Sequence, residues 1–261
     1  MKLRILGCGT SSGVPRVGND WGLCDRDEPR NRRRRAAILV SYDRARILVD
    51  TPPDLREQLL EAEVSDVEAV IWTHDHADHC HGIDDLRQLY HARGRPVAGY
   101  ARQATLEMLD RRFGYAFEGK GGYPAVVTGH LLPNHMNLAG LSIRAVDQPH
   151  GEITSAGLRF DAGGVAIGYS TDFDSLTDDM SMLFEGLDLW VVDALRRKPH
   201  PTHPHLAQTL EWIERLAPKR AILVHMDNSM DYRTLCAELP KGSSPAMTGW
   251  KSSCERRRSG P

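Results

Sequence analysis

One short polar segment constrains the fold of this chain more than any other feature. The apolar stretch Val67–Thr73 is predicted to be a buried strand, and the residues after it read His74-Asp75-His76-Ala77-Asp78-His79. Six residues thus hold three imidazoles and two carboxylates, the side chains that zinc and similar divalent ions bind. A solvated polar loop that happens to contain histidine is the alternative. The density of ligand-type side chains at the end of a buried strand favours a metal site.

The spacing within this segment indicates how its residues would share the metal. In extended backbone, side chains two residues apart point to the same side, so we expect His74 and His76 to face one ion together. Asp78 and His79 come at the turn into the next predicted helix, where they can face a second ion. The segment therefore predicts a site for two ions, of the kind that makes water nucleophilic at neutral pH.

The rest of the chain is predicted to mix strands and helices. Apolar runs of strand length, several of them rich in Val and Ile, predict strands at 3–6, 37–41, 46–49, 69–73, 96–100, 141–146, 165–170, 189–192 and 221–225. Helices are predicted at 54–63, 83–91, 104–113, 179–185 and 206–216. The early strands follow one another directly, and the later ones alternate with helices. This order favours two sheets packed face to face, with helices outside, over a doubly wound parallel sheet.

Composition and charge exclude several classes of protein. The chain has 261 residues, 41% of them hydrophobic, and a net charge of −2, so neither broad nucleic-acid attraction nor membrane attraction is expected. No run has the pattern of a signal peptide or a membrane-spanning helix, and the five cysteines are scattered, which predicts a cytoplasmic protein with reduced thiols. We expect one domain over residues 1–245 and a polar, disordered tail over residues 246–261.

The string His74-x-His76-x-Asp78-His79 after a strand resembles the signature of the metallo-β-lactamase fold superfamily. The resemblance covers most of the chain, residues 1–245, and implies an α/β (α+β) fold: an αββα sandwich of two mixed sheets with helices on the outer faces. It also implies that single residues at later strand ends complete the metal site. The matching positions are His150 after Asp147-Gln148-Pro149, Asp172 after Tyr169-Ser170-Thr171, and His225 after Ile222-Leu223-Val224.

The resemblance assigns these residues to two divalent ions, Zn²⁺ or Mn²⁺. It implies His74, His76 and His150 on one ion, Asp78, His79 and His225 on the other, and Asp172 between them. Asp50, at the end of another predicted strand, would support the ligand loops by hydrogen bonds without touching metal. Taken singly, each later residue has another interpretation. His150 could be a surface histidine, Asp172 a turn or helix-capping residue, and His225 a strand-end histidine.

The N-terminal segment narrows the resemblance to one branch. Gly7-Cys8-Gly9-Thr10-Ser11-Ser12-Gly13-Val14-Pro15 is similar to the opening loop of the phosphodiesterase branch. That branch includes tRNA 3′-processing endonucleases and the PhnP-like phosphoribosyl cyclic phosphate phosphodiesterases. Further matches are Asp20-Trp21-Gly22-x-Cys24-Asp25, Pro29-x-Asn31-Arg32-Arg33, His200-Pro201-Thr202-His203, and Asp231-Tyr232 leading to Leu239-Pro240.

The resemblance implies that His203 gives a proton to the leaving alkoxide, a task that suits a histidine titrating near neutral pH. The predicted catalytic set is His203, Asp78 and Asp172. The loop 10–13 offers hydroxyls and backbone N–H groups to a phosphate. The predicted substrate contacts are Thr10, Ser11, Ser12 and His200. The alternatives are a tight turn that needs glycine in the first loop, and a surface loop rich in proline and histidine in the second.

Two further features bear on the substrate. The run Arg30–Arg35 could bind a second phosphate or RNA, although a solvated strand flank is the favoured interpretation. Some PhnP-like proteins hold a structural zinc with closely spaced cysteines near the N-terminus, but only Cys24 stands in that stretch here, so no such zinc is predicted. The chain also lacks a spare Gly/Pro-rich segment for the arm with which tRNA-processing enzymes grip tRNA.

The leading hypothesis is a phosphodiesterase with two metal ions that hydrolyses a small cyclic phosphate, such as a phosphoribosyl 1,2-cyclic phosphate. A ribonuclease or a nucleotide cyclic phosphodiesterase on the same scaffold is the second hypothesis. A non-catalytic carrier of metal or ligand is the third, and the complete ligand set argues against it. The expected partner is a small phosphodiester, not a membrane or a nucleic acid, and a homodimer is compatible with the sequence.

Overall fold

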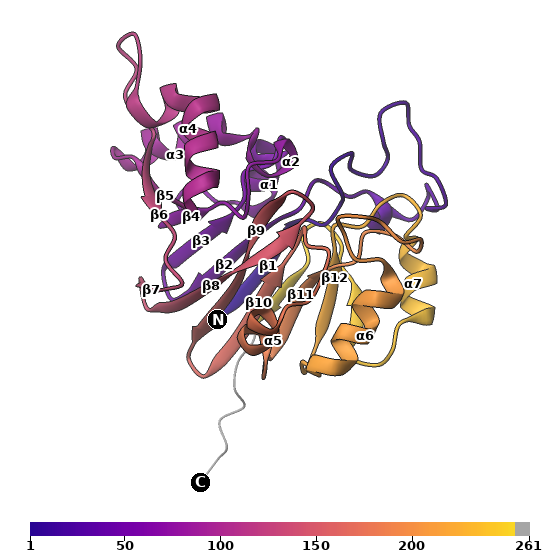
Figure 1. Ribbon diagram of the computed structural model, residues 1–261. Helices are drawn as coiled ribbons and strands as arrows, with labels where there is room; N and C mark the ends of the chain where they lie inside the picture. Colours follow the sequence, from indigo (N-terminus) through magenta and orange to yellow (C-terminus); the bar gives the residue numbers. More distant parts are fainter. Residues whose placement is uncertain (254–261) are drawn as a thin grey trace.

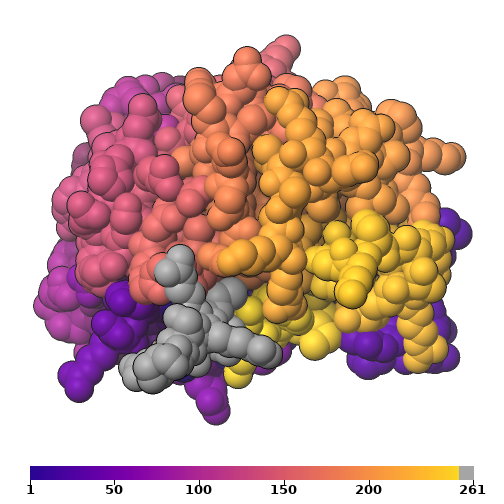
Figure 2. Space-filling view, turned by 90° about the horizontal axis from the view of Figure 1, so that it is seen from below, coloured from indigo at the N-terminus to yellow at the C-terminus, as the bar shows by residue number. Residues whose placement is uncertain are grey.

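The computed structural model describes residues 1–253 and contains two seven-stranded sheets packed face to face, with helices on both outer sides (Figure 1). The strand orders are β14-β1-β2-β3-β4-β5-β6 and β13-β12-β11-β10-β9-β8-β7. The first half of the chain builds one sheet and the second half the other, except that β14 returns to the first sheet. Seen from below, the indigo-to-magenta half and the orange-to-yellow half lie side by side (Figure 2). The predicted αββα sandwich is confirmed.

The first sheet carries its helices on the side away from the second sheet. Its strands are β1 (Lys2–Gly7), β2 (Ala37–Tyr42), β3 (Ala45–Val49), β4 (Ala69–Ile71), β5 (Val97–Ala101), β6 (Val127–Leu131) and β14 (Lys251–Ser253). The helices of this half are α1 (Leu55–Ala62), α2 (Ala77–Cys80), α3 (Leu86–Arg93) and α4 (Gln103–Glu118). Two short 3-10 turns are η1 (Pro29–Asn31) and η2 (Ile83–Asp85).

The second sheet is covered by three helices. Its strands are β7 (His135–Leu138), β8 (Leu141–His150), β9 (Ile153–Ala162), β10 (Val165–Ser170), β11 (Leu189–Asp193), β12 (Ala221–Val224) and β13 (Ser243–Pro245). The helices are α5 (Asp178–Phe184), α6 (Leu206–Leu216) and α7 (Tyr232–Glu238). Across residues 1–253, no helix combines the length and apolar character that crossing a membrane requires.

Within each sheet, the strands that lead to predicted site residues run in one direction. In the first sheet β3 and β4 are parallel. In the second sheet β10, β11 and β12 are parallel, and β8 has the same direction because β9 is antiparallel to both β8 and β10. The carboxyl ends of such strands meet at the same edge of a sheet, and the loops that follow them are brought together there. This edge carries the candidate site.

The core follows from the alternation of side chains along the strands. On β3, Ile47 and Val49 face the second sheet, whereas Leu48 faces the helices. Phe160 and Ile167 contribute to the same inter-sheet core from the other side, and all of these side chains are fully buried. The central strands are therefore apolar on both faces, which is why they read as continuous apolar runs in the sequence.

All predicted helices and strands overlap observed elements, but seven of the α-helices and strands in residues 1–253 had no clear signal in the sequence. These are β6, β7, β9, β13, β14, α2 and α7. The strand β9 shows the reason. It begins Ile153-Thr154-Ser155-Ala156-Gly157, without an apolar alternation, and its place is set by its hairpin pairing with β8 along the whole length of both strands. Cross-strand pairing of this kind is a tertiary constraint that periodicity does not reveal.

The predicted end of the domain at residue 245 is wrong. Ala246 is fully buried, and β14 pairs antiparallel with β1, with Ser252 opposite Leu3 and Lys251 opposite Arg4. The fold therefore includes residues up to Ser253. Polar residues can form this strand because an edge strand contributes backbone hydrogen bonds and needs little apolar surface. The rest of the predicted tail, residues 254–261, lies outside the described residues.

Leu158, which is fully buried between the two sheets, provides a test of the core. Leu158→Ala should lower the free energy of unfolding by about 2–5 kcal/mol, because it removes apolar contacts and leaves a cavity. Leu23→Ala is the matched control, since the Leu23 side chain is 74% exposed, and it should change stability by less than about 0.5 kcal/mol. Chemical denaturation measures both, and equal losses would contradict the assignment of Leu158 to the core.

Candidate metal centre

The seven side chains predicted as metal ligands lie together at one edge of the sandwich. They form two groups, in each of which the candidate ligand atoms all lie within 4.8 Å of one another. The groups are His74, His76, His150 and Asp172, and Asp78, His79, Asp172 and His225. Asp172 belongs to both groups, as expected for a carboxylate between two ions. The structure thus brings together every residue of the predicted ligand set.

Distances within the cluster show how Asp172 joins the two groups. Its Oδ1 lies 3.9 Å from His74 Nε2 and 3.8 Å from His150 Nε2, both in the first group. It also lies 3.5 Å from His225 Nε2 in the second group, and Asp172 Oδ2 is 3.2 Å from His79 Nε2. Each oxygen therefore faces imidazole nitrogens, and the carboxylate sits in the middle of the cluster.

The backbone turns sharply where the strands deliver two of these ligands and the supporting residue Asp50. Asp50, Asp172 and His225 follow β3, β10 and β12, and they have φ values of 66°, 56° and 58°. This left-handed conformation is uncommon for residues other than glycine, although Asn, Asp and His adopt it more readily than most. It redirects each side chain from the sheet into the site. Local strain of this kind is concentrated at functional sites.

Hydrogen bonds at Nδ1 orient three of the histidines toward the centre. His79 Nδ1 donates to Asp50 Oδ2 at 2.8 Å, and His150 Nδ1 donates to the Thr202 carbonyl at 2.9 Å. His74 Nδ1 lies 3.0 Å from Thr73 Oγ1. With Nδ1 engaged in this way, Nε2 carries the lone pair that can bind a cation. A hydrogen bond at the ring nitrogen that does not bind the ion is typical of histidines that bind metal.

Asp50 has the supporting contacts predicted for it. Its side chain is fully buried and, besides the bond from His79, accepts hydrogen bonds from the Thr73 backbone N–H at 2.8 Å and from the Thr73 hydroxyl. It belongs to neither ligand group. Asp50 therefore holds the segment that begins at His74 in place through hydrogen bonds and is not itself among the candidate ligands.

Burial and charge act strongly on these groups. Burial lowers the pKa of His74 well below its ordinary value, and the neighbouring His79 adds to this effect. Burial also tends to lower the pKa of His79, but the carboxylates of Asp172, Asp78 and Asp50 outweigh it and raise that pKa well above the ordinary value. The same carboxylates attract any cation, so a metal ion and a proton would compete for His79 Nε2.

The donor set fits divalent metal. The Nε2 atom of His74 is buried and forms no hydrogen bond with any group in residues 1–253, and that of His79 is buried between the carboxylates of Asp78 and Asp172. Buried polar atoms without partners cost free energy, and a bound cation removes that cost. Imidazole nitrogen with carboxylate oxygen is the donor set of zinc and of manganese.

One functional residue was missed in the sequence. Asp193 Oδ2 accepts a hydrogen bond from His203 Nδ1 at 2.9 Å and another from the Asp172 backbone N–H at 2.9 Å. A signal was present, because Asp193 ends the apolar run of β11 just as Asp50 follows the apolar run of β3. Asp193, His203 and His225 form a third group of potential ligands. The short contact already satisfies His203 Nδ1, so we interpret it as a hydrogen-bonded pair.

His203 lies on the rim of the cluster. Its Nε2 is 3.8 Å from Asp172 Oδ1, and its ring is stacked on that of His225 with centroids 4.9 Å apart. The side chain keeps 12% of its surface exposed, whereas those of His74 and His79 are fully buried. The ring of His200 follows at 5.1 Å from that of His203.

The loop with the predicted substrate contacts lies beside the end of β12. The Thr10 backbone N–H donates to the carbonyl of Met226, the residue after His225, at 3.2 Å. The Gly13 N–H closes a turn on the Thr10 carbonyl at 2.8 Å, and Gly13 has a φ of 66°. The turn interpretation of this loop is therefore correct. Phosphate contacts by Thr10, Ser11 and Ser12 stay a prediction.

The run Arg30–Arg35 is engaged in internal contacts. Arg30 pairs with Glu28, Arg34 with Glu61 and Arg35 with Asp54, and Arg32 lies over the Trp21 ring. Arg33 is buried and donates to the carbonyls of Asp227 and Met230 at 3.1 and 2.5 Å. The indigo segment accordingly lies against the yellow C-terminal part in Figures 1 and 2. Arg33 ties the N-terminal segment to the loop after His225, and Arg34 and Arg35 tie it to α1 and its N-cap, a structural role more specific than a solvated flank.

Known proteins agree with this geometry. The family described as "Beta-lactamase superfamily domain" matches residues 45–226, which include all seven candidate ligands. Among curated proteins, the octanoyltransferase of Porphyromonas gingivalis is 31% identical over 234 residues, which are 87% of this chain. This chain spans only 46% of that protein's length.

Solved structures resemble the whole chain. A diphosphatase of the PhnP family is 36% identical, with a TM-score of 0.89 over 97% of this chain and 98% of that one. Zinc-bound PqqB from Methylobacterium extorquens shares the fold at 20% identity, with a TM-score of 0.79 over 97% of this chain and 100% of that one. The short form of human tRNase Z shares it at 16% identity, with a TM-score of 0.70 over 97% of this chain and 99% of that one. The chain belongs to the PhnP family of the β-lactamase superfamily and is a metal-dependent hydrolase.

Proposed function

We propose that this protein is a phosphodiesterase that hydrolyses a small cyclic phosphate of a sugar, such as a phosphoribosyl 1,2-cyclic phosphate, with two divalent ions, Zn²⁺ or Mn²⁺. The observation that carries this proposal is the position of His203. Its Nδ1 is fixed on Asp193, and its Nε2 points to the rim of a cluster that suits two ions. A metal site next to a histidine that can release a proton suits the cleavage of an ester with a poor leaving group.

In this proposal, His74, His76 and His150 would hold one ion, Asp78, His79 and His225 would hold the other, and Asp172 belongs to both groups of ligands. When bound, such a pair of ions supplies positive charge that activates water and neutralises the phosphoryl oxygens. Asp50 keeps His79 oriented through its 2.8 Å hydrogen bond, so the ligand geometry does not depend on flexible side chains.

In this proposal, residues of the chain supply the proton that the leaving oxygen needs. Hydrolysis joins the oxygen of water to phosphorus, with loss of one water proton to solvent, and breaks the bond from phosphorus to the sugar oxygen. That oxygen takes a proton from His203 as it departs, and His203 regains one from solvent. His203, protonated on both nitrogens, donates from Nε2 to that oxygen. The Asp193 carboxylate accepts the hydrogen bond from Nδ1 and stabilises the positive charge on the ring before transfer. His200, whose ring contacts that of His203, is the proposed neighbour of the sugar.

A small substrate agrees with the surface around the site. The arginines of the run 30–35 are engaged with carboxylates, an aromatic ring and carbonyls, so they offer no free basic strip to a nucleic-acid backbone. A diphosphate is the second candidate substrate, and the 36% identity to a PhnP-family diphosphatase favours it. Octanoyl transfer is not proposed, since this chain spans only 46% of the length of the octanoyltransferase that it resembles.

Metal content tests the proposed centre. Fully loaded wild-type protein should contain about two divalent ions per chain by elemental analysis. Asp172→Ala should lower this content and abolish activity, because the residue contacts both groups of ligands, while circular dichroism should stay close to that of the wild type. Asp27→Ala, at an exposed position, is the control and should keep full metal content. One ion or fewer in loaded wild type would refute the two-ion proposal.

A panel of substrates tests the reaction. The value of kcat/KM for cyclic and linear phosphodiesters should exceed that for a phosphomonoester, a β-lactam or a thioester by roughly 100-fold or more. The reason is that side chains placed for the charge and leaving group of a phosphodiester stabilise the transition states of the other substrates poorly. A diphosphate that is cleaved faster than every phosphodiester would select the second candidate. Faster turnover of the lactam or the thioester would contradict phosphodiester hydrolysis.

The leaving group tests the role of His203. A ribose hydroxyl needs a proton in the transition state, whereas an activated aryl oxygen is stable as an anion. His203→Ala should therefore reduce kcat for a sugar cyclic phosphate by roughly 10²–10⁴-fold and affect an aryl phosphodiester much less. Asp193→Asn should show the same preference with a smaller loss, and His135→Ala, at an exposed position, should have no effect.

Metal analysis accompanies these measurements. His203 belongs to the proposed proton path and not to the ligand set, so the variant should keep its metal. Equal losses on both substrates with full metal content would assign His203 to substrate positioning. A fall in metal content would make it a ligand.

A further inference from the structure

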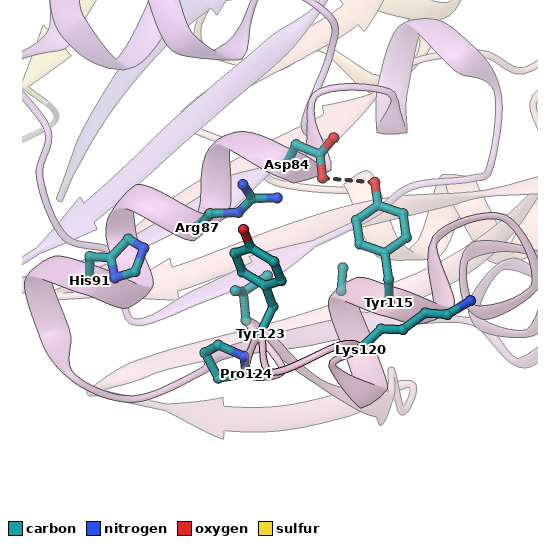
Figure 3. Close-up of a pocket in the computed structure, with 9 residues that line it drawn as sticks. Asp84, Arg87, His91, Tyr115, Lys120, Tyr123 and Pro124 are labelled. Atoms are coloured by element: carbon teal, nitrogen blue, oxygen red, sulfur yellow. Dashed lines mark hydrogen bonds between the residues drawn. The ribbon is translucent and has the colours of Figure 1, made fainter.

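A cavity of about 290 Å³ lies between α3, α4 and the turn that follows α4 (Figure 3). Tyr115, Tyr123 and Pro124 form its apolar walls, together with Ala116 and Val126. None of its lining residues belongs to the metal centre or to the loop of His203. The cavity is therefore a second concave site on the chain.

The turn after α4 holds an aromatic ring over this cavity. Gly119 ends the helix with a φ of 73°, and a Cβ at this position would meet the Tyr123 carbonyl at 2.5 Å, so glycine is required for the chain to fold back. Lys120 and Tyr123 then exchange backbone hydrogen bonds at 3.1 and 3.0 Å. Tyr123 remains 71% exposed. A flat ligand that stacks on this ring would bury apolar surface that water now covers.

The charges at the cavity favour an anion. Arg87 and Lys120 both line it, and the Arg87 guanidinium lies 5.8 Å from the centroid of the Tyr123 ring. The lining thus holds two cationic side chains and one carboxylate, that of Asp84, which accepts a hydrogen bond from the Tyr115 hydroxyl at 2.7 Å. Figure 3 shows Arg87 and the two tyrosine rings around the same space. The cavity combines an aromatic surface, a net positive charge and one oriented acceptor.

We propose that this cavity binds a mononucleotide. Its base would stack on Tyr123 and Tyr115, its phosphate would contact Arg87, and a ribose hydroxyl or an amino group of the base would donate to Asp84. The three kinds of group in the cavity match the three parts of a nucleotide, since bases stack on aromatic rings and phosphates pair with guanidinium and ammonium groups. The volume lies just under the roughly 300 Å³ at which ligand pockets begin, which suits one nucleotide and not a dinucleotide.

Calorimetric titration of the metal-loaded full chain with adenosine monophosphate tests this site. Tyr123→Ala should weaken binding about tenfold through the loss of stacking, and Arg87→Ala should weaken it about tenfold through the loss of a phosphate contact. Both residues are exposed, so neither variant should unfold. Arg111→Ala is the matched control, since Arg111 is exposed on α4 and does not line the cavity, and it should bind like wild type.

Two partial ligands separate the contributions of base and phosphate. Adenosine and ribose 5-phosphate should each bind at least about tenfold more weakly than adenosine monophosphate, because each lacks one of the two anchoring groups. Undetectable binding of the nucleotide, equal affinity in wild type and in both cavity variants, or ribose 5-phosphate binding as tightly as the nucleotide would overturn the proposal. Binding of the nucleotide at the metal centre would give the second of these results.

Discussion

The Asp172 carboxylate is the point at which the two halves of the molecule meet. Five imidazoles have a nitrogen within 3.9 Å of its oxygens. His74 and His79 come from the first sheet, and the others come from the second. A buried carboxylate in such a place is costly unless positive charge or hydrogen-bond donors surround it. The chain supplies few fixed positive charges there, so bound metal ions would neutralise the buried carboxylate best. Because the ligands come from both sheets, the same ions would also hold the two sheets together at this edge.

The sheets satisfy this requirement through the direction of their strands. β4, β8, β10 and β12 deliver their last residues to the same edge, and left-handed backbone at Asp172 and His225 turns these side chains inward. The ligands are therefore distant in sequence but need no long loops to meet. The Arg33 guanidinium performs a related task at the side of the site, because it holds the carbonyls of the loop after His225 from within the N-terminal segment. The hydrogen bond from the Thr10 backbone N–H to the Met226 carbonyl ties the predicted substrate loop to the end of the ligand strand β12.

The family resemblance selected residues that the structure gathers in one place, because they stand at or just after the ends of strands, and strand direction converts that position into proximity. The sequence was less predictive where partners are distant. The strand β14 is polar, and only its pairing with β1 makes it a strand. The arginines of the run 30–35 look like an exposed basic patch in the sequence, because their partners Glu28, Glu61 and Asp54 are brought to them only by the fold. Asp193 was overlooked because an aspartate at a strand end is unremarkable until His203 approaches it from a separate loop.

The two strand-final aspartates show how the site divides its work. Asp50 binds Nδ1 of His79 at 2.8 Å, and Asp193 binds Nδ1 of His203 at 2.9 Å, so the local chemistry of the two pairs is the same. The difference lies at the other nitrogen. His79 Nε2 is buried between the carboxylates of Asp78 and Asp172, where a lone pair can bind only a cation. The side chain of His203 keeps some contact with solvent, where a nitrogen can exchange protons. Exposure, and not the residue type, therefore makes one pair suited to holding metal and the other to moving a proton.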